Sequence, residues 1–252
     1  RGRAPVHYDE ELNLDMSEED EEFKPDGSTA WFVNNPSKAY ENSLEILTKL
    51  NESSPENMLE GLFRQEDFAH AQIAARGFGW DSNFTFKDWR EFKWSNTKTP
   101  GFLVVEGQRE DHSKFRAYFV WTSEEGLRLD WAATTGWCEN PLNDLISNPP
   151  AEGVLVRCLL AKEPHFDILR GPASLRSWYL LGSPNTDQRI WGFATAGSAL
   201  DQDLLDLFGF GRIVLERKSE VRASVKISKP EIGLKKNQFE IVELVTEEWV
   251  LP

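Results

Sequence analysis

Asp130 is the residue of this sequence whose type and setting could support chemistry. In the segment 127–131 polar and apolar side chains alternate, so that Arg128 and Asp130 share one face of an expected strand. If that face lined a hollow, the Asp130 carboxylate could act as a general base or anchor a ligand. No second acid or histidine follows at the spacing of a catalytic dyad, so we expect instead a structural ion pair with Arg116 or Arg128.

Four other side chains could complete a ligand-binding site around Asp130. Arg116 and Tyr118 lie on one face of the alternating stretch 115–121, and a neighbouring strand brings cross-strand residues within about 5.5 Å. Trp137 belongs to a group of tryptophans in the first half of the chain, two or more of which could line a pocket. The predicted ligand-binding residues are therefore Arg116, Tyr118, Arg128, Asp130 and Trp137.

The sequence contains little else that is typical of catalysis. It has no G-x-S-x-G motif, no P-loop and no H-E-x-x-H motif, and its four histidines are scattered along the chain. Cys138 and Cys158 lack the spacing of metal ligands, and we expect two buried thiols. We therefore expect no metal, no cofactor and no enzymatic activity.

The charge distribution bears on the class of partner. The formal net charge is −14, and residues 1–22 alone carry −7, which predicts an acidic disordered tail or linker over 1–30; an acidic recognition tail is the alternative. The rest of the chain is mildly acidic, which disfavours a general nucleic-acid surface. Residues 212–236 carry a local charge of +5 that could track a single strand of nucleic acid, but an edge strand rich in lysine explains the same charges.

Helices and a meander are expected to position these residues in the first half. Asn35-Pro36 suits the start of a helix, and Tyr40, Leu44, Leu47 and Leu50 then share one face. Shorter helices are expected over 54–63 and 65–76, the latter ended by Gly77. Strands are expected at 102–106, 115–121 and 127–131, with one apolar and one mixed face.

The second half has the pattern of a β-rich domain with one helix, and we place the boundary near Glu139. A short helix-like stretch covers 142–146. A longer helix should begin after Ser198 as its N-cap and end at Gly209. Strands are expected at 154–160, 178–181, 190–194, 212–215, 223–227 and 239–245.

Several of these features resemble known families. Three short helices followed by a curved antiparallel sheet resemble an NTF2-like (SnoaL-type) cone. The stretches LDWAATTGW (129–137), PLNDL (141–145) and NQFEIVE (237–243) resemble an uncharacterised bacterial family that joins such a domain to a small β-rich one, often behind a membrane anchor. The resemblance implies an α+β chain with an NTF2-like domain over 31–138 and a β-rich domain over 139–252, and it implies no activity. The second half also has the element order of an OB-fold.

Three functions compete on these grounds. The first is a non-enzymatic binding or assembly module for an unknown protein or small molecule. The alternatives are an NTF2-like isomerase, dehydratase or hydrolase that uses Asp130, and an OB-type binder of single-stranded nucleic acid, which the net charge disfavours. A hollow around Asp130 would favour the enzyme, and a filled interior would favour the binding module.

The chain begins at Arg1 without an initiator Met, so we expect contact with a membrane only through a missing upstream anchor. The compartment stays open between the cytoplasm and a membrane-tethered position, and a homodimer is compatible with the sequence.

Overall fold

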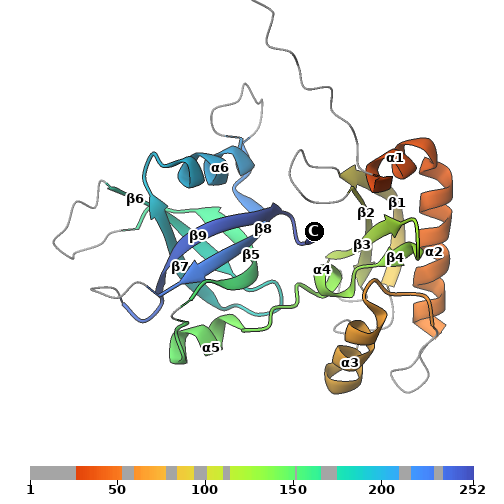
Figure 1. Cartoon of the computed structure of the whole chain (residues 1–252), viewed down its shortest axis with the longest axis horizontal. Coiled ribbons are helices and arrows are strands. Elements are labelled where there is room, and N and C mark those ends of the chain that lie inside the picture. Colours follow the sequence, from red (N-terminus) through yellow and green to blue (C-terminus); the bar gives the residue numbers. More distant parts are fainter. Residues whose placement is uncertain are drawn as a thin grey trace, which may run out of the picture.

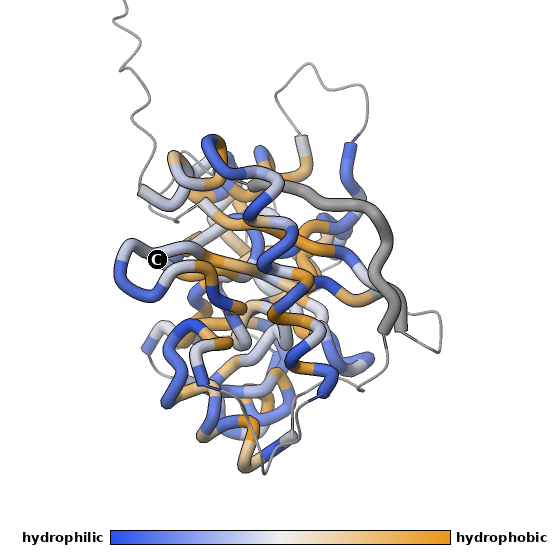
Figure 2. Tube along the Cα trace, turned by 90° about the vertical axis from the view of Figure 1, so that its right-hand side faces the viewer, coloured by the Kyte–Doolittle hydropathy of each residue, from blue (hydrophilic) through white to orange (hydrophobic). Residues whose placement is uncertain are grey.

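The computed structural model describes residues 27–52, 60–77, 84–93, 101–109, 114–150, 152–165, 175–209, 217–229 and 235–252, with the backbone alone for 84–93, 108, 109 and 114. Over these ranges a helix-and-sheet unit is followed by a barrel unit (Figure 1). The predicted α+β class is confirmed. Figure 2, in which the helix-and-sheet unit faces the viewer, shows apolar stretches (orange) alternating with polar ones (blue) along the chain.

Two helices that meet at Asn35 cover one face of the sheet. Helix α1 (Gly27–Asn34) ends where the Asn35 side-chain amide donates to Trp31 O at 2.9 Å, and α2 (Pro36–Glu52) begins with the predicted proline. Leu47 and Leu50 are buried against the sheet, which confirms the predicted helical face. Helix α1 starts inside the range 1–30 that composition assigns to a tail, because Trp31 stacks on Trp121 with ring centroids 5.3 Å apart.

Helix α3 (Glu66–Arg76) also lies on this side of the molecule. It confirms the predicted helix, and Gly77 follows it at φ 76°, a backbone conformation that favours glycine. The helix expected over 54–63 falls mostly outside the described residues. Its last two residues, Leu62 and Phe63, lie in the core, and Phe63 forms a parallel bridge with Leu129.

The sheet is an antiparallel meander in the order β1-β2-β3-β4, formed by β1 (Phe84–Lys93), β2 (Phe102–Arg109), β3 (Lys114–Thr122) and β4 (Gly126–Leu129). Strand β1 was not expected from the sequence. The predicted alternation of β3 is confirmed: Phe115, Ala117 and Phe119 pack under the helices, while Tyr118 and Val120 lie on the opposite, outer face.

The expected strand over 127–131 is too long by two residues. Strand β4 ends at Leu129, and Trp131 opens a short helix, α4 (Trp131–Thr135). The Asp130 side chain accepts a hydrogen bond from Ala133 N, so it caps the helix and turns the chain out of the sheet.

The barrel unit begins with α5 (Leu142–Ser147) and continues through β5 (Val154–Lys162), β6 (Arg176–Gly182), β7 (Arg189–Thr195), α6 (Ala199–Leu207), β8 (Glu220–Ser228) and β9 (Gln238–Glu247). Its strands close in the order β5-β6-β7-β9-β8, and β8 pairs back onto β5. The pairs are antiparallel except β7–β9, which is parallel. Ser198 caps α6 as predicted, whereas the strand expected at 212–215 lies outside the described residues.

After β9 the chain returns to the first unit. Trp249 and Val250 pack on Phe102, Tyr118 and Val120, and this small third core also includes Val104, Ala133 and Leu159. The outer face of the sheet, which the sequence describes as mixed, is therefore covered by residues 248–252 (Figure 1). None of the helices in the described ranges is both long and apolar enough to span a membrane.

Candidate functional site

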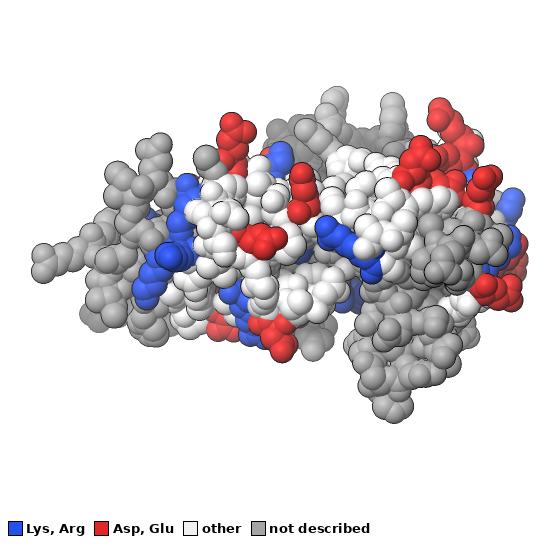
Figure 3. Space-filling model, turned by 90° about the horizontal axis from the view of Figure 1, so that it is seen from below, with Lys and Arg blue, Asp and Glu red and all other residues white. Residues whose placement is uncertain are grey.

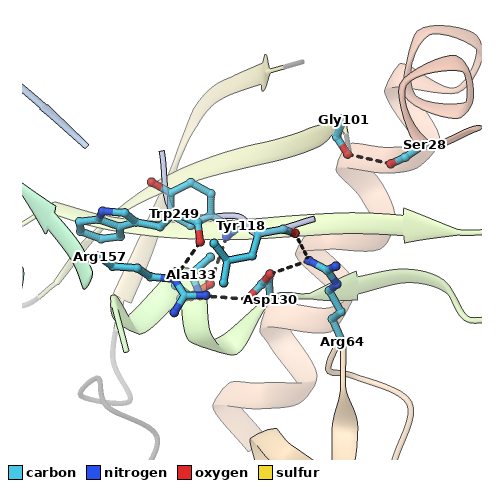
Figure 4. A network of polar contacts seen from close by, with 10 residues as sticks. Ser28, Arg64, Gly101, Tyr118, Asp130, Ala133, Arg157 and Trp249 are labelled. Carbon is cyan, nitrogen blue, oxygen red and sulfur yellow. Dashed lines mark hydrogen bonds and ion pairs between the residues drawn. The ribbon is translucent and has the colours of Figure 1, made fainter. Parts of the chain in front are cut away.

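Asp130 lies at the junction between the two units, and both of its carboxylate oxygens are engaged. Oδ1 accepts from Ala133 N at 2.9 Å, and Oδ2 lies 3.1 Å from Arg64 Nη1 (Figure 4). The residue is only 6% exposed. The expectation of an ion pair is met, but the described partner is Arg64 rather than Arg116 or Arg128. The cause is the turn after Leu129, which carries the carboxylate toward the Phe63–Arg64 segment that bridges β4.

A second guanidinium, that of Arg157 in β5, is buried beside this pair at 4% exposure. It donates from Nε to Trp249 O at 2.8 Å and from Nη1 to Trp137 O at 2.6 Å. Burial lowers the pKa of Arg157, and the negative charge of Asp130 opposes that shift. The Asp130 carboxylate therefore offsets the positive charges of Arg64 and Arg157, which belong to different units. This role stabilises the junction between the units.

Arg116 and Tyr118 contact the C-terminal segment. The Tyr118 hydroxyl donates to Glu248 Oε2 at 2.7 Å, and Arg116 pairs with Glu106 at 2.7 Å and Glu248 at 3.5 Å. Burial raises the pKa of Tyr118, so its phenol stays a neutral donor. Glu248 itself is buried and has φ 66°, which places a strained residue under these two side chains.

The other two predicted ligand residues lie elsewhere. Arg128 lines a surface cavity of about 590 Å³ together with residues of α2 and the Glu60–Leu62 segment. Trp137 is half-buried, and its ring meets Phe68 edge-on at 5.0 Å. Arg128 therefore lies apart from the junction network, and Trp137 reaches it through its backbone carbonyl. Buried apolar side chains, with Leu129 and Trp131 next to Asp130 among them, pack on the helix-covered side of the sheet.

The two cysteines differ in burial. Cys158 is fully buried in the barrel core, as expected, but Cys138 is only half-buried, and Arg157 N donates to its sulfur at 3.0 Å. Burial raises the pKa of both thiols, which keeps them protonated and poor nucleophiles.

A buried carboxylate also marks the start of α6. Asp201 accepts from Tyr179 Oη at 2.7 Å, Ser177 Oγ at 2.8 Å and Gly197 N at 2.9 Å. Burial alone would raise the pKa of Asp201, but these hydrogen bonds outweigh it and lower the pKa. A carboxylate that accepts three hydrogen bonds is suited to holding the helix rather than to proton transfer.

The outer face of β6 and β7 carries an aromatic cluster that sequence reasoning missed. Trp178 and Phe193 are directly opposite each other across the two strands, with ring centroids 5.3 Å apart. Trp191 lies two pairs further along, opposite Leu180. The alternation of these residues with Tyr179 and Gly192, whose positions face the interior, was the available signal. Trp178 and Phe193 are buried and Trp191 is half-buried, and such a cluster on the outward side of barrel strands is a candidate contact surface.

His165 and Gln238 complete this surface. The His165 ring lies 4.3 Å from the ring centroids of both Trp178 and Trp191. Its Nε2 is 2.7 Å from the Nε2 of the fully buried Gln238, and Lys229 Nζ donates to Gln238 O at 2.9 Å. We call Trp178, Trp191, Phe193 and Gln238 the aromatic corner, and the His165 ring lies in it.

Charge is unevenly distributed along one side of the molecule. Figure 3 shows basic side chains gathered at the barrel end and acidic side chains at the helical end.

Among the described residues, no group of three or more His, Cys, Asp or Glu side chains could hold a metal ion. The rings and the Gln238 amide of the aromatic corner suit recognition by ring stacking and hydrogen bonding.

The comparisons with known proteins assign no family to this chain. No protein-family model matches the sequence, and no curated protein matches it.

Proposed function

We propose that the protein is a non-enzymatic binding module whose contact surface is the aromatic corner on β6 and β7. The strand order with its parallel β7–β9 pair, and the position of α6 between β7 and β8, support an OB-type barrel. In OB-folds the second and third strands form the ligand-binding face. Here those strands are β6 and β7, and the presence of the aromatic corner on them is the observation that carries the proposal.

The geometry of Asp130 gives little support to an enzyme. A general base needs a free lone pair directed at substrate, whereas the described oxygens of Asp130 are engaged by Ala133 N and Arg64. The outer face beside it is occupied by Trp249 and Val250. We assign the first unit, which we propose to be NTF2-like from its three helices and meander, the role of a support for the barrel.

The ligand is a protein or a small molecule rather than nucleic acid in this proposal. Sequence-independent nucleic-acid binders need an excess of positive charge. The chain carries a net charge of −14.

Site-specific photo-crosslinking in the native cell tests the proposal. A photoreactive phenylalanine would replace Trp191 in the full chain, and a control chain would carry it at Val33, which is 59% exposed on α1. We expect an adduct of defined mass from position 191 that is lost when an untagged wild-type chain is supplied in excess. Equal adducts at both positions, or no adduct at 191, would refute a contact surface on this face.

A further inference from the structure

His165 occupies the aromatic corner in the manner of a ligand. The planes of Trp178 and Trp191 are nearly perpendicular, at 84°, with centroids 6.4 Å apart, and the imidazole fills the angle between them. Its plane is inclined by 53° to one indole and 37° to the other. A single planar ring therefore contacts both tryptophans.

The hydrogen bond from Gln238 defines what kind of ring fits. Gln238 Oε1 accepts from Lys235 N at 2.8 Å, so the amide nitrogen is the group that faces His165. An amide nitrogen only donates, which makes His165 Nε2 the acceptor and leaves that nitrogen without a proton. The corner thus presents two aromatic rings and one in-plane donor.

The groups that form the corner belong to the barrel framework, while its occupant does not. Trp178 and Trp191 lie in β6 and β7, and Gln238 is the direct register partner of Trp191 in the parallel β7–β9 pair. His165 lies three residues beyond the end of β5 at Lys162, outside any strand. Withdrawal of one side chain would therefore leave the two rings and the donor in place.

We propose that the aromatic corner binds a planar heteroaromatic ring with an in-plane acceptor nitrogen, and that His165 is its intramolecular competitor. The inference rests on the proposed function, because it names the ligand class and the regulation of the same face. A ligand gains access only when His165 leaves, so the apparent affinity of the resting chain is reduced by the fraction of molecules with an open corner.

Removal of the competitor in the full chain tests the inference. Adenosine and pyridine serve as probes with a ring acceptor, and benzene serves as the probe without one. His165→Ala is compared with wild type and with His70→Ala, which removes a histidine that also packs edge-on against a ring, Phe63, but on α3. Binding is followed by NMR through the indole N–H signals of Trp178 and Trp191.

We expect His165→Ala to bind pyridine or adenosine at least about tenfold more tightly than wild type, with shifts of both indole signals, and His70→Ala to match wild type. Tighter binding of pyridine alone would point to a compact azine-type ring, and tighter binding of adenosine to a nucleoside-type ligand. If His165→Ala loses its fold, His165→Asn, which lacks the ring that contacts both indoles, carries the same expectation.

Two results would overturn the inference. Equal affinity of wild type and the folded His165 variants would show that His165 does not compete. Binding of benzene as tight as that of pyridine would show that Gln238 does not select an acceptor. Either result would leave the crosslinking at position 191 unaffected, so the two proposals fail separately.

Discussion

Replacement of Asp130 separates the two tasks that its carboxylate performs at the junction. Asp130→Asn keeps an oxygen that can accept from Ala133 N but removes the charge that faces Arg64. Asp130→Ala removes both. Because the side chains of Arg64 and Asp130 are 17% and 9% exposed, water compensates the loss of this ion pair poorly.

The magnitudes follow from these contacts. A hydrogen bond to a charged group contributes about 1.5–3 kcal/mol, and unpairing a fully buried charge costs about 3–5 kcal/mol. With the slight exposure of Arg64, we expect Asp130→Asn to lower the free energy of unfolding by about 2–3 kcal/mol. Asp130→Ala adds the lost helix cap, about 1 kcal/mol more. Combining Asp130→Asn with Arg64→Met should give a coupling energy of about 1–2 kcal/mol.

Urea unfolding followed by circular dichroism and tryptophan fluorescence measures these differences. Asp187→Asn, on an exposed loop of the barrel, is the matched control and should change the stability by less than about 0.5 kcal/mol. A wild-type stability for Asp130→Asn would refute the ion pair as a structural element. Equal costs for Asn and Ala would refute the capping role.

Three further outcomes are expected. Asp201→Asn should destabilise the chain by about 2 kcal/mol at pH 7. Because the folded pKa of Asp201 is lowered, its contribution is complete above the unfolded value of about 3.9 and is lost as pH falls further. Urea titrations of the two chains should therefore converge as the pH falls below about 4, and a constant difference would contradict this sign. Deletion of residues 248–252 should lower the stability by more than about 4 kcal/mol and split a single calorimetric transition into two, because Trp249 and Val250 join the units; one unchanged transition would show that the units are coupled elsewhere. Fluorescence anisotropy with a dT20 oligonucleotide at about 150 mM salt should give a dissociation constant weaker than about 1 μM, and a tighter, salt-dependent one would favour the nucleic-acid alternative.

Much of the fold could be predicted from local sequence patterns, because the helix starts and strand faces concerned depend on residues that are close in the sequence. The α2 start at Pro36, the alternation of β3 and the Ser198 cap each depend on residues within a few positions of one another. The two faces of β3 were likewise separable from polarity alone. The capping role of Asp130 was equally local, but the alternation of 127–131 concealed it.

Long-range pairing explains what the sequence could not predict about the site. Asp130 pairs with a residue 66 positions away, and nothing in the composition around Arg64 marks it as that partner. The aromatic corner and the His165 ring that occupies it come from β6, β7, β9 and the segment after β5, which only the closed barrel brings together. The mixed face expected for the sheet is covered by a return of the chain that no periodicity indicates.

The return of residues 248–251 to the first sheet has a consequence for synthesis of the chain. Tyr118 can form its hydrogen bond only after Glu248, 130 residues later, has been synthesised. At a synthesis rate of about 5–20 residues per second this interval is on the order of 10 s. During that time the nascent first unit presents Phe102, Tyr118 and Val120 without their cover. While the chain is still being synthesised, the outer face of the first sheet is therefore apolar and uncovered. We expect chaperones to bind the nascent chain at this face.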